Sequence, residues 1–254
     1  MKLVSVITPS RLRTSSLLRA AQSVCRQHYP RIEHIIIGDN HPRLTRLTSQ
    51  LQAINPRITV LSLKVPTNIV YRPWRTAIVR NHGISIANGD YIAHLDDDNE
   101  MEPEHIASLV SVLEDQKADA AHSWRKLYTR SGRPLQIKAY PWCKNGRIGK
   151  YLLTEFLKAG IYIPRSNECR DVMVTPTGDV LLHVDSSEWL VQRTVHQSVK
   201  FPISYTLRNI IHEQTEDYLL ASEFYNKSLR IACSNKATLR YYLGGYSNSN
   251  SLVK

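Results

Sequence analysis

The chain of 254 residues has only four cysteines, and no two of them form a CxxC pair. They stand far apart, at Cys25, Cys143, Cys169 and Cys233. A zinc ribbon or a disulfide framework would need closer or regularly spaced cysteines. We therefore expect buried or half-buried free thiols and neither kind of framework.

Long hydrophobic runs are also missing. The sequence has no stretch of about eighteen apolar residues, the length that a membrane-spanning helix requires, so no such helix is predicted. The first residues, MKLVSVITPS, lead straight into a core-like segment without the apolar stretch and cleavage site of a signal peptide. We expect a cytoplasmic protein.

Acidic residues are scarce in three parts of the chain. The whole sequence has 33 Lys and Arg against 22 Asp and Glu, a net charge of +11. No acidic residue occurs before Glu33, between 40 and 89, or over 120–154, where eight Lys and Arg fall. Positive surfaces concentrate anionic ligands such as nucleotides, nucleic acid or acidic lipid headgroups. Such a ligand and ordinary solvated charge both fit these stretches.

The first 115 residues alternate between contiguous apolar runs and segments whose apolar residues recur every three or four positions. A contiguous run such as Ile35–Ile37 suits a parallel strand covered on both faces. The alternation predicts an α/β fold, with a Rossmann-like, mostly parallel central sheet flanked by helices. Strands are expected at Leu3–Thr8, Glu33–Ile37, Ile58–Leu63 and Tyr91–Leu95, and helices after Ser15 or Ser16, over Leu44–Leu51, over Trp74–Ala87 and from Pro103.

The pattern of apolar residues is less regular over 116–254. We expect these residues and the half at 1–115 to form a single domain of residues 1–254. The sequence has no internal repeat. We expect a long loop or irregular hairpin over Ser123–Lys150, helices over Tyr151–Leu157, Ser186–Val195 and Ala221–Cys233, a strand over Phe201–Ile211, and a flexible tail at about 244–254.

Polar residues follow three of the expected strands. Thr8-Pro9-Ser10 follows the first, Gly38-Asp39-Asn40 the second and Asp96–Asp98 the fourth. In sheets of this kind ligands bind just beyond the carboxyl ends of the strands. We therefore expect these three segments to meet at one sheet edge.

The adjacent carboxylates of Asp96, Asp97 and Asp98 repel one another unless a cation neutralises them. Oxygen ligands of this kind select Mg²⁺ or Mn²⁺. Such an ion can bridge to a diphosphate and stabilise charge on a leaving phosphate group. The alternative is an acidic loop that caps the following helix.

Two more side chains fit a nucleotide at this edge. Asp39 can accept hydrogen bonds from a base or a ribose, and Arg80 can donate charge-assisted hydrogen bonds to a diphosphate. An ordinary turn aspartate and a surface arginine are the alternatives.

Five segments occur in an order that resembles a known family. They are Val4–Ser10 (VSVITPS), Ala21–Tyr29 (AQSVCRQHY), Glu33–Asn40 (EHIIIGDN), Arg80–Asp90 (RNHGISIANGD) and Tyr91–Pro103 (YIAHLDDDNEMEP). Order and approximate spacing across about Leu3–Leu113 resemble the GT-A glycosyltransferases of the large inverting family that includes cellulose, chitin and hyaluronan synthases. The resemblance implies a GT-A fold and a UDP- or GDP-sugar donor. Ser10-Arg11-Leu12 and Gly38 depart from the pattern and leave the base open.

The resemblance also implies roles for single residues. Thr8 and Asp39 match positions that contact the nucleoside, and Arg80 matches the arginine near the donor phosphates. Asp96 and Asp98 match the outer residues of the metal-binding DxD motif, with Asp98 the more direct ligand. The expected donor-binding set is Thr8, Pro9, Ser10, Asp39, Arg80, Asp96 and Asp97.

An inverting transferase needs a carboxylate that deprotonates the acceptor hydroxyl. In the family this base lies in an "ED" motif ahead of an arginine. Here Asp185 and Glu188 precede Arg193, at distances that differ from the usual one, and we favour Asp185. The same two residues also fit a capping box at the start of a helix.

Four further residues are candidates in the second half. His212, after an expected strand, is a candidate third metal ligand, with a structural histidine as the alternative. Trp124, Tyr140 and Trp142 lie among Lys and Arg residues and can form a wall for an anionic acceptor. A packed hairpin is the alternative.

The sequence thus predicts a metal-dependent glycosyltransferase that moves a sugar from a nucleoside-diphosphate sugar to a hydroxyl acceptor, with inversion. A retaining transferase, a nucleotidyltransferase on the same scaffold and a non-catalytic sugar-nucleotide binder remain alternatives. A nucleic-acid-binding protein would leave the five segments without a purpose, so we expect no nucleic acid partner. The basic surface can still contact acidic lipid at the inner face of a membrane.

Overall fold

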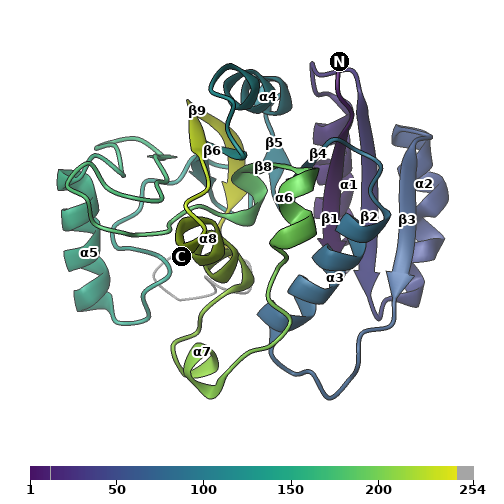
Figure 1. Ribbon diagram of the computed structural model, residues 1–254. Coiled ribbons are helices and arrows are strands. Elements are labelled where there is room, and N and C mark those ends of the chain that lie inside the picture. Colours follow the sequence, from purple (N-terminus) through teal and green to yellow (C-terminus); the bar gives the residue numbers. More distant parts are fainter. Residues whose placement is uncertain (12, 245–254) are drawn as a thin grey trace.

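The structure, a computed structural model, describes residues 1–11 and 13–244 (Figure 1). Leu12 lies outside the described residues, as does the expected tail apart from Gly244. A nine-stranded sheet runs through the molecule in the order β3-β2-β1-β4-β8-β6-β9-β5, and β7 pairs with β6. None of the described helices is both long and apolar enough to cross a membrane.

The first half confirms the predicted alternation. Strands β1, β2, β3 and β4 are parallel neighbours, and they match the four expected strands closely. Their bounds, and those of the intervening helices, are β1 Val4–Ser10, α1 Thr14–Cys25, β2 Ile32–Asp39, η1 Pro42–Leu47, α2 Thr48–Ile54, β3 Ile58–Leu63, α3 Arg72–Ile86 and β4 Tyr91–His94.

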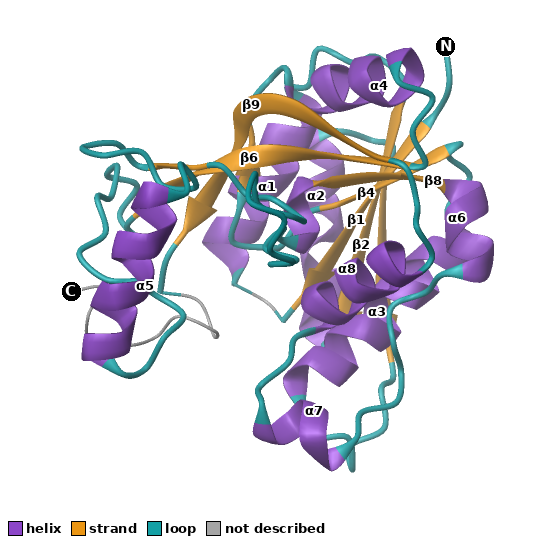
Figure 2. Ribbon diagram, turned by 60° about the vertical axis from the view of Figure 1, so that its left-hand side comes forward, coloured by secondary structure: helices purple, strands orange, loops and turns teal. Residues whose placement is uncertain are grey.

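Helices cover both faces of the parallel strands (Figure 2). Ile36 packs with Leu17 of α1 on one face, while Ile35 and Ile37 pack with Val79 of α3 on the other. Successive residues of a strand point to opposite faces, so the contiguous isoleucines enter two different cores. The predicted strand covered on both faces is therefore confirmed.

A glycine lets α3 approach the sheet closely. A Cβ atom at Gly83 would lie 2.5 Å from Ile7 Cγ2, a distance that no real contact tolerates. The close packing fixes the position of α3 over β1, and with it the position of Arg80.

The second half departs from the prediction in four places. The elements that follow β4 are β5 Glu100–Met101, α4 His105–Asp115, β6 Ala120–Tyr128, α5 Gly146–Lys158, β7 Glu168–Cys169, η2 Ser186–Glu188, β8 Trp189–Gln192, α6 Arg193–Ser198, α7 Leu207–Ile211, α8 Glu216–Asn226 and β9 Ile231–Tyr242. The long loop expected over 123–150 is wrong at both ends, where β6 and α5 extend into it. Helix α4 matches the helix expected from Pro103, and α5 contains the helix expected over Tyr151–Leu157.

The helix expected over 186–195 is wrong. Only a 3₁₀ turn follows the cap at Asp185, and Trp189–Gln192 then forms β8 between β4 and β6. Tertiary pairing on both sides overrides the local helical pattern.

Two further expectations in this half are wrong. Residues 201–206 are irregular, and Thr206 caps the short helix α7 where a strand was expected. Helix α8 begins at Glu216 and ends at Asn226, and Ser228 then adopts a positive φ of 51°. The chain continues as β9, which pairs along β6.

Candidate active site

The three polar segments meet at the carboxyl ends of the parallel strands, as predicted. The Ser10 hydroxyl donates to Asp97 Oδ2 at 2.8 Å, and the Arg11 backbone N–H donates to the same oxygen at 3.2 Å. Arg11 Nε also lies 3.8 Å from Asp39 Oδ2. The segments that follow β1, β2 and β4 therefore form one site.

The three adjacent aspartates have different environments. Asp97 is buried and accepts the hydrogen bonds from Ser10 and Arg11, and burial raises its pKa. The side chains of Asp96 and Asp98 are 32% and 22% exposed. Asp97 thus holds the aspartate loop to the segment after β1, and its expected donor contact stays a prediction. The outer pair fits a divalent cation, because its carboxylate oxygens are accessible.

Both outer aspartates have arginine partners. Asp98 is ion-paired with Arg13, whose side chain is 39% exposed. Asp96 Oδ1 accepts from Arg80 Nη2 at 2.5 Å. Arg13 can leave Asp98 without breaking the core, because much of its side chain is in solvent.

Arg80, by contrast, is fully buried. Its guanidinium lies 5.4 Å from the ring centre of Phe201 and 3.8 Å from Glu216. A side chain without exposed surface has no direct access to a bound phosphate. Here Arg80 holds Asp96 in place, and its expected contact with a donor phosphate stays a prediction that its burial does not support.

Asp39 is bound by an arginine that the sequence analysis missed. Arg75 donates from Nε to Asp39 Oδ2 at 2.8 Å and from Nη2 to Oδ1 at 2.5 Å. Arg75 Nη1 also donates to the backbone oxygens of Pro66 and Ile69. A carboxylate oxygen can accept more than one hydrogen bond, so a contact from Asp39 to a nucleoside stays a prediction.

The expected nucleoside contact of Thr8 stays a prediction that its side chain does not support. Its side chain is fully buried, and its hydroxyl pairs with His34 Nε2 at 2.9 Å. Burial lowers the pKa of His34 to about 3, so this histidine is neutral. Thr8 therefore links β1 to β2, and half-buried Pro9 is the more accessible neighbour.

The two candidate bases form the capping box that the sequence suggested. Asp185 Oδ1 accepts from the Ser187 N–H at 2.9 Å, and Glu188 Oε2 accepts from the Asp185 N–H at 2.8 Å. The Ser187 hydroxyl in turn accepts the backbone N–H of Asp96 at 3.1 Å. This bond joins the turn of Asp185 directly to the aspartate loop.

The two acids differ in accessibility and charge. Asp185 is 9% exposed, and burial together with the charge of Asp96 raises its pKa to about 7. Glu188 is fully buried, and burial and Asp171 raise its pKa well above the usual range. Asp185 is thus the one of the two whose pKa lies near neutral pH, while burial favours the neutral form of Glu188.

Buried Arg125 lies close to both Asp185 and Glu188 and also binds Asp171. Arg125 Nη1 lies 3.5 Å from Asp185 Oδ2 and 4.0 Å from Glu188 Oε2, and Arg125 Nη2 donates to Asp171 Oδ1 at 2.9 Å. The Arg125 guanidinium lies over the rings of both Trp142 and Tyr241, 4.8 and 4.9 Å from their centres. This cation balances the surrounding carboxyl groups.

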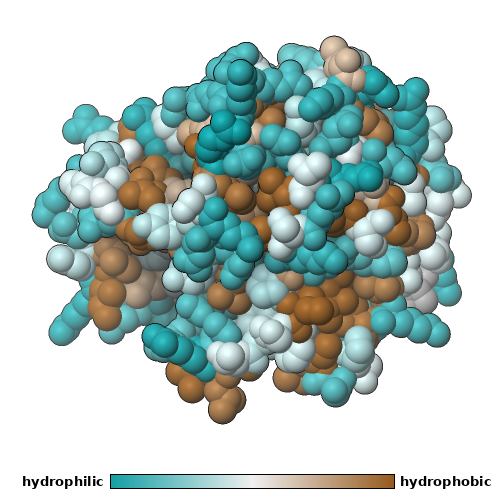
Figure 3. Space-filling view, viewed as in Figure 1, coloured by the Kyte–Doolittle hydropathy of each residue, from teal (hydrophilic) through white to brown (hydrophobic). Residues whose placement is uncertain are grey.

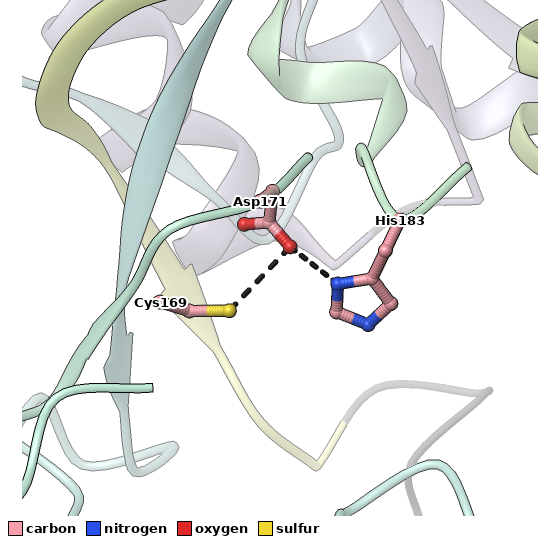
Figure 4. Close-up of side chains that lie close together, drawn as sticks. All are labelled: Cys169, Asp171 and His183. Carbon is pink, nitrogen blue, oxygen red and sulfur yellow. Dashed lines mark hydrogen bonds and ion pairs between the residues drawn. The ribbon is translucent and has the colours of Figure 1, made fainter. Parts of the chain in front are cut away.

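Asp171 also contacts two metal-ligating residue types, Cys169 and His183 (Figure 4). His183 Nδ1 lies 2.6 Å from Asp171 Oδ1, and the Cys169 thiol donates to the same oxygen at 3.4 Å. Arg125 already occupies that oxygen, and a buried guanidinium opposes a second cation beside it. The cluster therefore fits a hydrogen-bonded network better than a metal site.

The three expected acceptor residues do not form one wall. Trp142 packs on Tyr140, and the Tyr140 hydroxyl pairs with His183 Nε2 at 2.9 Å. Trp124 instead stacks on Arg170 and lines a separate cavity of about 850 Å³. An acceptor contact stays a prediction for Tyr140 and Trp142, and the shared wall with Trp124 is corrected.

His212 lies in a different setting from the one expected. It is the exposed C-cap residue of α7, and its backbone N–H donates to Arg208 O at 3.0 Å. It does not follow a strand. Its role as a third metal ligand stays a prediction that no observed contact supports.

Two acids at the start of α8 were missed. Glu216 lies beside Arg80, and burial, together with the neighbouring charge of Asp217, raises the pKa of Glu216 to about 8. The sequence Thr215-Glu216-Asp217 ahead of apolar residues is a recognisable helix start. This signal would have predicted that the helix begins at Glu216, beside Arg80, and not at Ala221.

Comparison with known proteins identifies a family. A sequence model described as "Glycosyl transferase family 2" matches residues 5–160. WcaA of Escherichia coli strain K12, provisionally named a colanic acid biosynthesis glycosyl transferase, is 30% identical over 144 residues, 55% of this chain and 49% of its own length. TuaG of Bacillus subtilis strain 168, provisionally named a teichuronic acid biosynthesis glycosyltransferase, is 28% identical over 134 residues, 52% and 50% of the two chains. The chain spans about half the length of the curated relatives it matches.

Solved structures show the same fold. S. aureus TarS 1-349 in complex with UDP superposes with a TM-score of 0.62 at 14% identity, covering 95% of this chain and 60% of that one. The mannosyltransferase PcManGT from Pyrobaculum calidifontis, in complex with GDP-Man and Mn²⁺, gives 0.60 at 12% identity, covering 94% and 56%. The expected GT-A fold is thus confirmed. Membership in the group of cellulose, chitin and hyaluronan synthases stays a prediction.

Proposed function

Because the chain belongs to glycosyl transferase family 2, we propose that it is a metal-dependent transferase that moves a sugar, with inversion, from a nucleoside-diphosphate sugar to a hydroxyl acceptor. The observation that carries the proposal is the hydrogen bond from the Asp96 N–H to the Ser187 hydroxyl. It holds a candidate base and a candidate cation-binding loop against each other. Inverting transfer needs the base beside the attacking hydroxyl and the cation beside the departing diphosphate, so both must lie near the same anomeric carbon.

The donor's diphosphate is assigned to the loop of Asp96 and Asp98. Their partly exposed carboxylates would hold Mn²⁺ or Mg²⁺, and such an ion, when bound, stabilises negative charge on the departing diphosphate. Arg80 keeps Asp96 oriented from the buried side. Arg11 and Arg13, with side chains 51% and 39% exposed, are the cations able to turn toward a phosphate.

Asp185 is assigned the role of base. Its carboxylate takes the proton of the acceptor hydroxyl while that oxygen attacks the anomeric carbon, and the bond from carbon to the diphosphate breaks. A pKa of about 7 suits this task, since a base works best when its pKa lies near the operating pH. Glu188 positions Asp185 by accepting its backbone N–H.

The nucleotide base and the sugar stay open. Structures of similar fold contain UDP, UDP-GlcNAc or GDP-Man, and these ligands belong to those proteins. Arg75 and Asp39 are proposed to form the side of the pocket that meets the nucleoside, because they close the β2 edge of the site. Tyr140 and Trp142 are proposed for the acceptor side.

The test is the identity of the released product. The protein is incubated with UDP- and GDP-sugars, Mn²⁺ and a panel of hydroxyl acceptors or water, and nucleoside diphosphate and pyrophosphate are quantified. We expect nucleoside diphosphate and a glycoside of inverted anomeric configuration. Pyrophosphate would indicate the nucleotidyltransferase alternative, retention of configuration the retaining one, and donor binding without turnover the non-catalytic binder.

A further inference from the structure

One end of the molecule carries exposed apolar side chains next to the candidate active site. Leu207 and Ile211 of α7 are 77% and 73% exposed, and Val70, in the loop before α3, is 85% exposed. Figure 3 shows apolar side chains gathered at this end, over α7 and over the start of α3. We call the following residues the apolar rim: Val70, Arg72, Ile203, Leu207, Arg208 and Ile211.

The two segments that form the apolar rim are held together. The Tyr71 hydroxyl donates to Gln214 O at 2.8 Å, and the rings of Tyr71 and Tyr205 meet edge to face at 5.1 Å. Helix α7 is closed at its start by the capping box of Thr206 and Asn209. The apolar rim is therefore a formed surface built from parts of the chain more than a hundred residues apart.

None of the residues of α7 is buried, although three of its five are apolar. Exposing apolar groups to water is unfavourable, and burying them is favourable. Contiguous exposed patches of such groups mark interaction sites. Because α7 contributes no buried residue to the core, its apolar side chains remain available to bind another surface.

The chain segments that supply the apolar rim carry charge of one sign. No acidic residue occurs over 40–89 or 189–212, and these stretches include the exposed Lys64 and Lys200. The next acidic residue along the chain, Glu213, is ion-paired with Lys144. Basic side chains next to exposed apolar ones fit the phosphates and acyl chains of an anionic lipid surface.

We infer that the apolar rim docks on the surface of an anionic lipid bilayer. Val70, Leu207 and Ile211 would enter the boundary between headgroups and acyl chains, and Arg72 and Arg208 would pair with lipid phosphates. A second copy of the chain fits less well, because two rims of the same charge would repel each other.

Docking at this place would hold the active site at the lipid surface. The segment between Phe201 and Glu216 carries most of the apolar rim, and both of these end residues contact Arg80. Arg80 in turn holds Asp96. The inference stands on the rim itself and does not require that sugar transfer be established.

The test measures binding of the purified chain to vesicles by co-sedimentation. Vesicles of phosphatidylcholine and phosphatidylglycerol in equal parts are compared with pure phosphatidylcholine. We expect binding to the mixed vesicles that weakens with salt, and little binding to the neutral ones. The double variant Leu207→Glu/Ile211→Glu should lose at least about tenfold in affinity, and Arg72→Gln/Arg208→Gln about fivefold for each charge removed.

The matched control is Ile148→Glu/Tyr151→Glu on α5, where both residues are likewise exposed. It should bind the vesicles as the unchanged chain does. All variants should keep their shift in melting temperature with nucleotide and Mn²⁺, which separates this test from that of the transfer reaction. Absence of binding to anionic vesicles, or equal losses in the α7 and α5 variants, would overturn the inference. So would a dimer in solution that the α7 variant dissolves without any vesicle binding.

Discussion

The hydroxyl of Ser187 accepts the backbone N–H of Asp96 at 3.1 Å, across 91 residues of sequence. Ser187 belongs to the turn that Asp185 caps, and Asp96 begins the loop that ends at Asp98. One serine thus connects the two halves of the domain at the point where the proposed base and the proposed cation site meet.

Replacing Ser187 should disturb the position of the proposed base relative to the proposed cation site. Ser187→Ala leaves the partly buried N–H of Asp96 without its acceptor, which costs about 1 kcal/mol. We expect a lower kcat with a smaller change in donor affinity, measured by steady-state kinetics. Ser186→Ala is the control, because the neighbouring Ser186 hydroxyl is buried without a hydrogen-bond partner. Equal kinetics in the two variants would show that the bond does not position the base.

The two acids of the capping box should respond differently to neutralisation. Asp185→Asn removes the proposed base and should lower kcat by about 10²–10⁴-fold, while nucleotide binding remains. Glu188→Gln should lose much less, because burial raises the pKa of Glu188 and so favours its neutral form, and glutamine can still accept the Asp185 N–H. Comparing kcat of both variants decides between the two candidates, and the reverse order would assign the base to Glu188.

The first half of the fold and the edge of the site could be predicted, and most of the second half could not. Contiguous apolar runs such as Ile35–Ile37 signal a covered strand on their own, and sheet geometry then brings Asp39 and Asp97 together. Residues 186–195 carry both a capping box and apolar spacing typical of a helix. Only β4 and β6 on either side make Trp189–Gln192 a strand, and the sequence does not reveal such long-range pairing.

The arginines of the site were missed for a related reason. Arg13 pairs with Asp98 across 85 residues, and Arg125 pairs with Asp171 across 46. No local pattern connects such partners. Arg80 was noticed, but neither its burial nor its contact with Asp96 was predicted.

Activity should rise with pH as Asp185 loses its proton. Burial and the charge of Asp96 raise the pKa of Asp185 to about 7, so the base is mostly protonated at pH 6 and mostly charged at pH 8. A cation bound by Asp96 lowers this pKa, which moves the rise to a lower pH but keeps its direction. Transfer rates at saturating donor and metal over pH 5–9 test this. Rates that are flat or that fall over the range would contradict Asp185 as the base.

Arg125 should matter for stability far more than other arginines. Its side chain is buried among Asp171, Asp185 and Glu188, and removing one partner of a buried ion pair costs about 3–5 kcal/mol. Arg125→Met should lower the free energy of unfolding in urea by that amount. Arg170→Met, at a half-exposed ion pair with Glu168, should cost about 1 kcal/mol or less. Similar losses in both variants would show that the network does not carry a buried charge balance.

The central claim is that the loop of Asp96 and Asp98 binds a divalent cation together with a nucleoside diphosphate. The most direct measurement is the shift in melting temperature caused by UDP or GDP, with and without Mn²⁺, in the unchanged chain, Asp98→Ala and the exposed control Asp115→Ala. We predict a shift that requires Mn²⁺ in the unchanged chain and in Asp115→Ala, and that disappears in Asp98→Ala. The same Mn²⁺-dependent shift in Asp98→Ala would contradict the account.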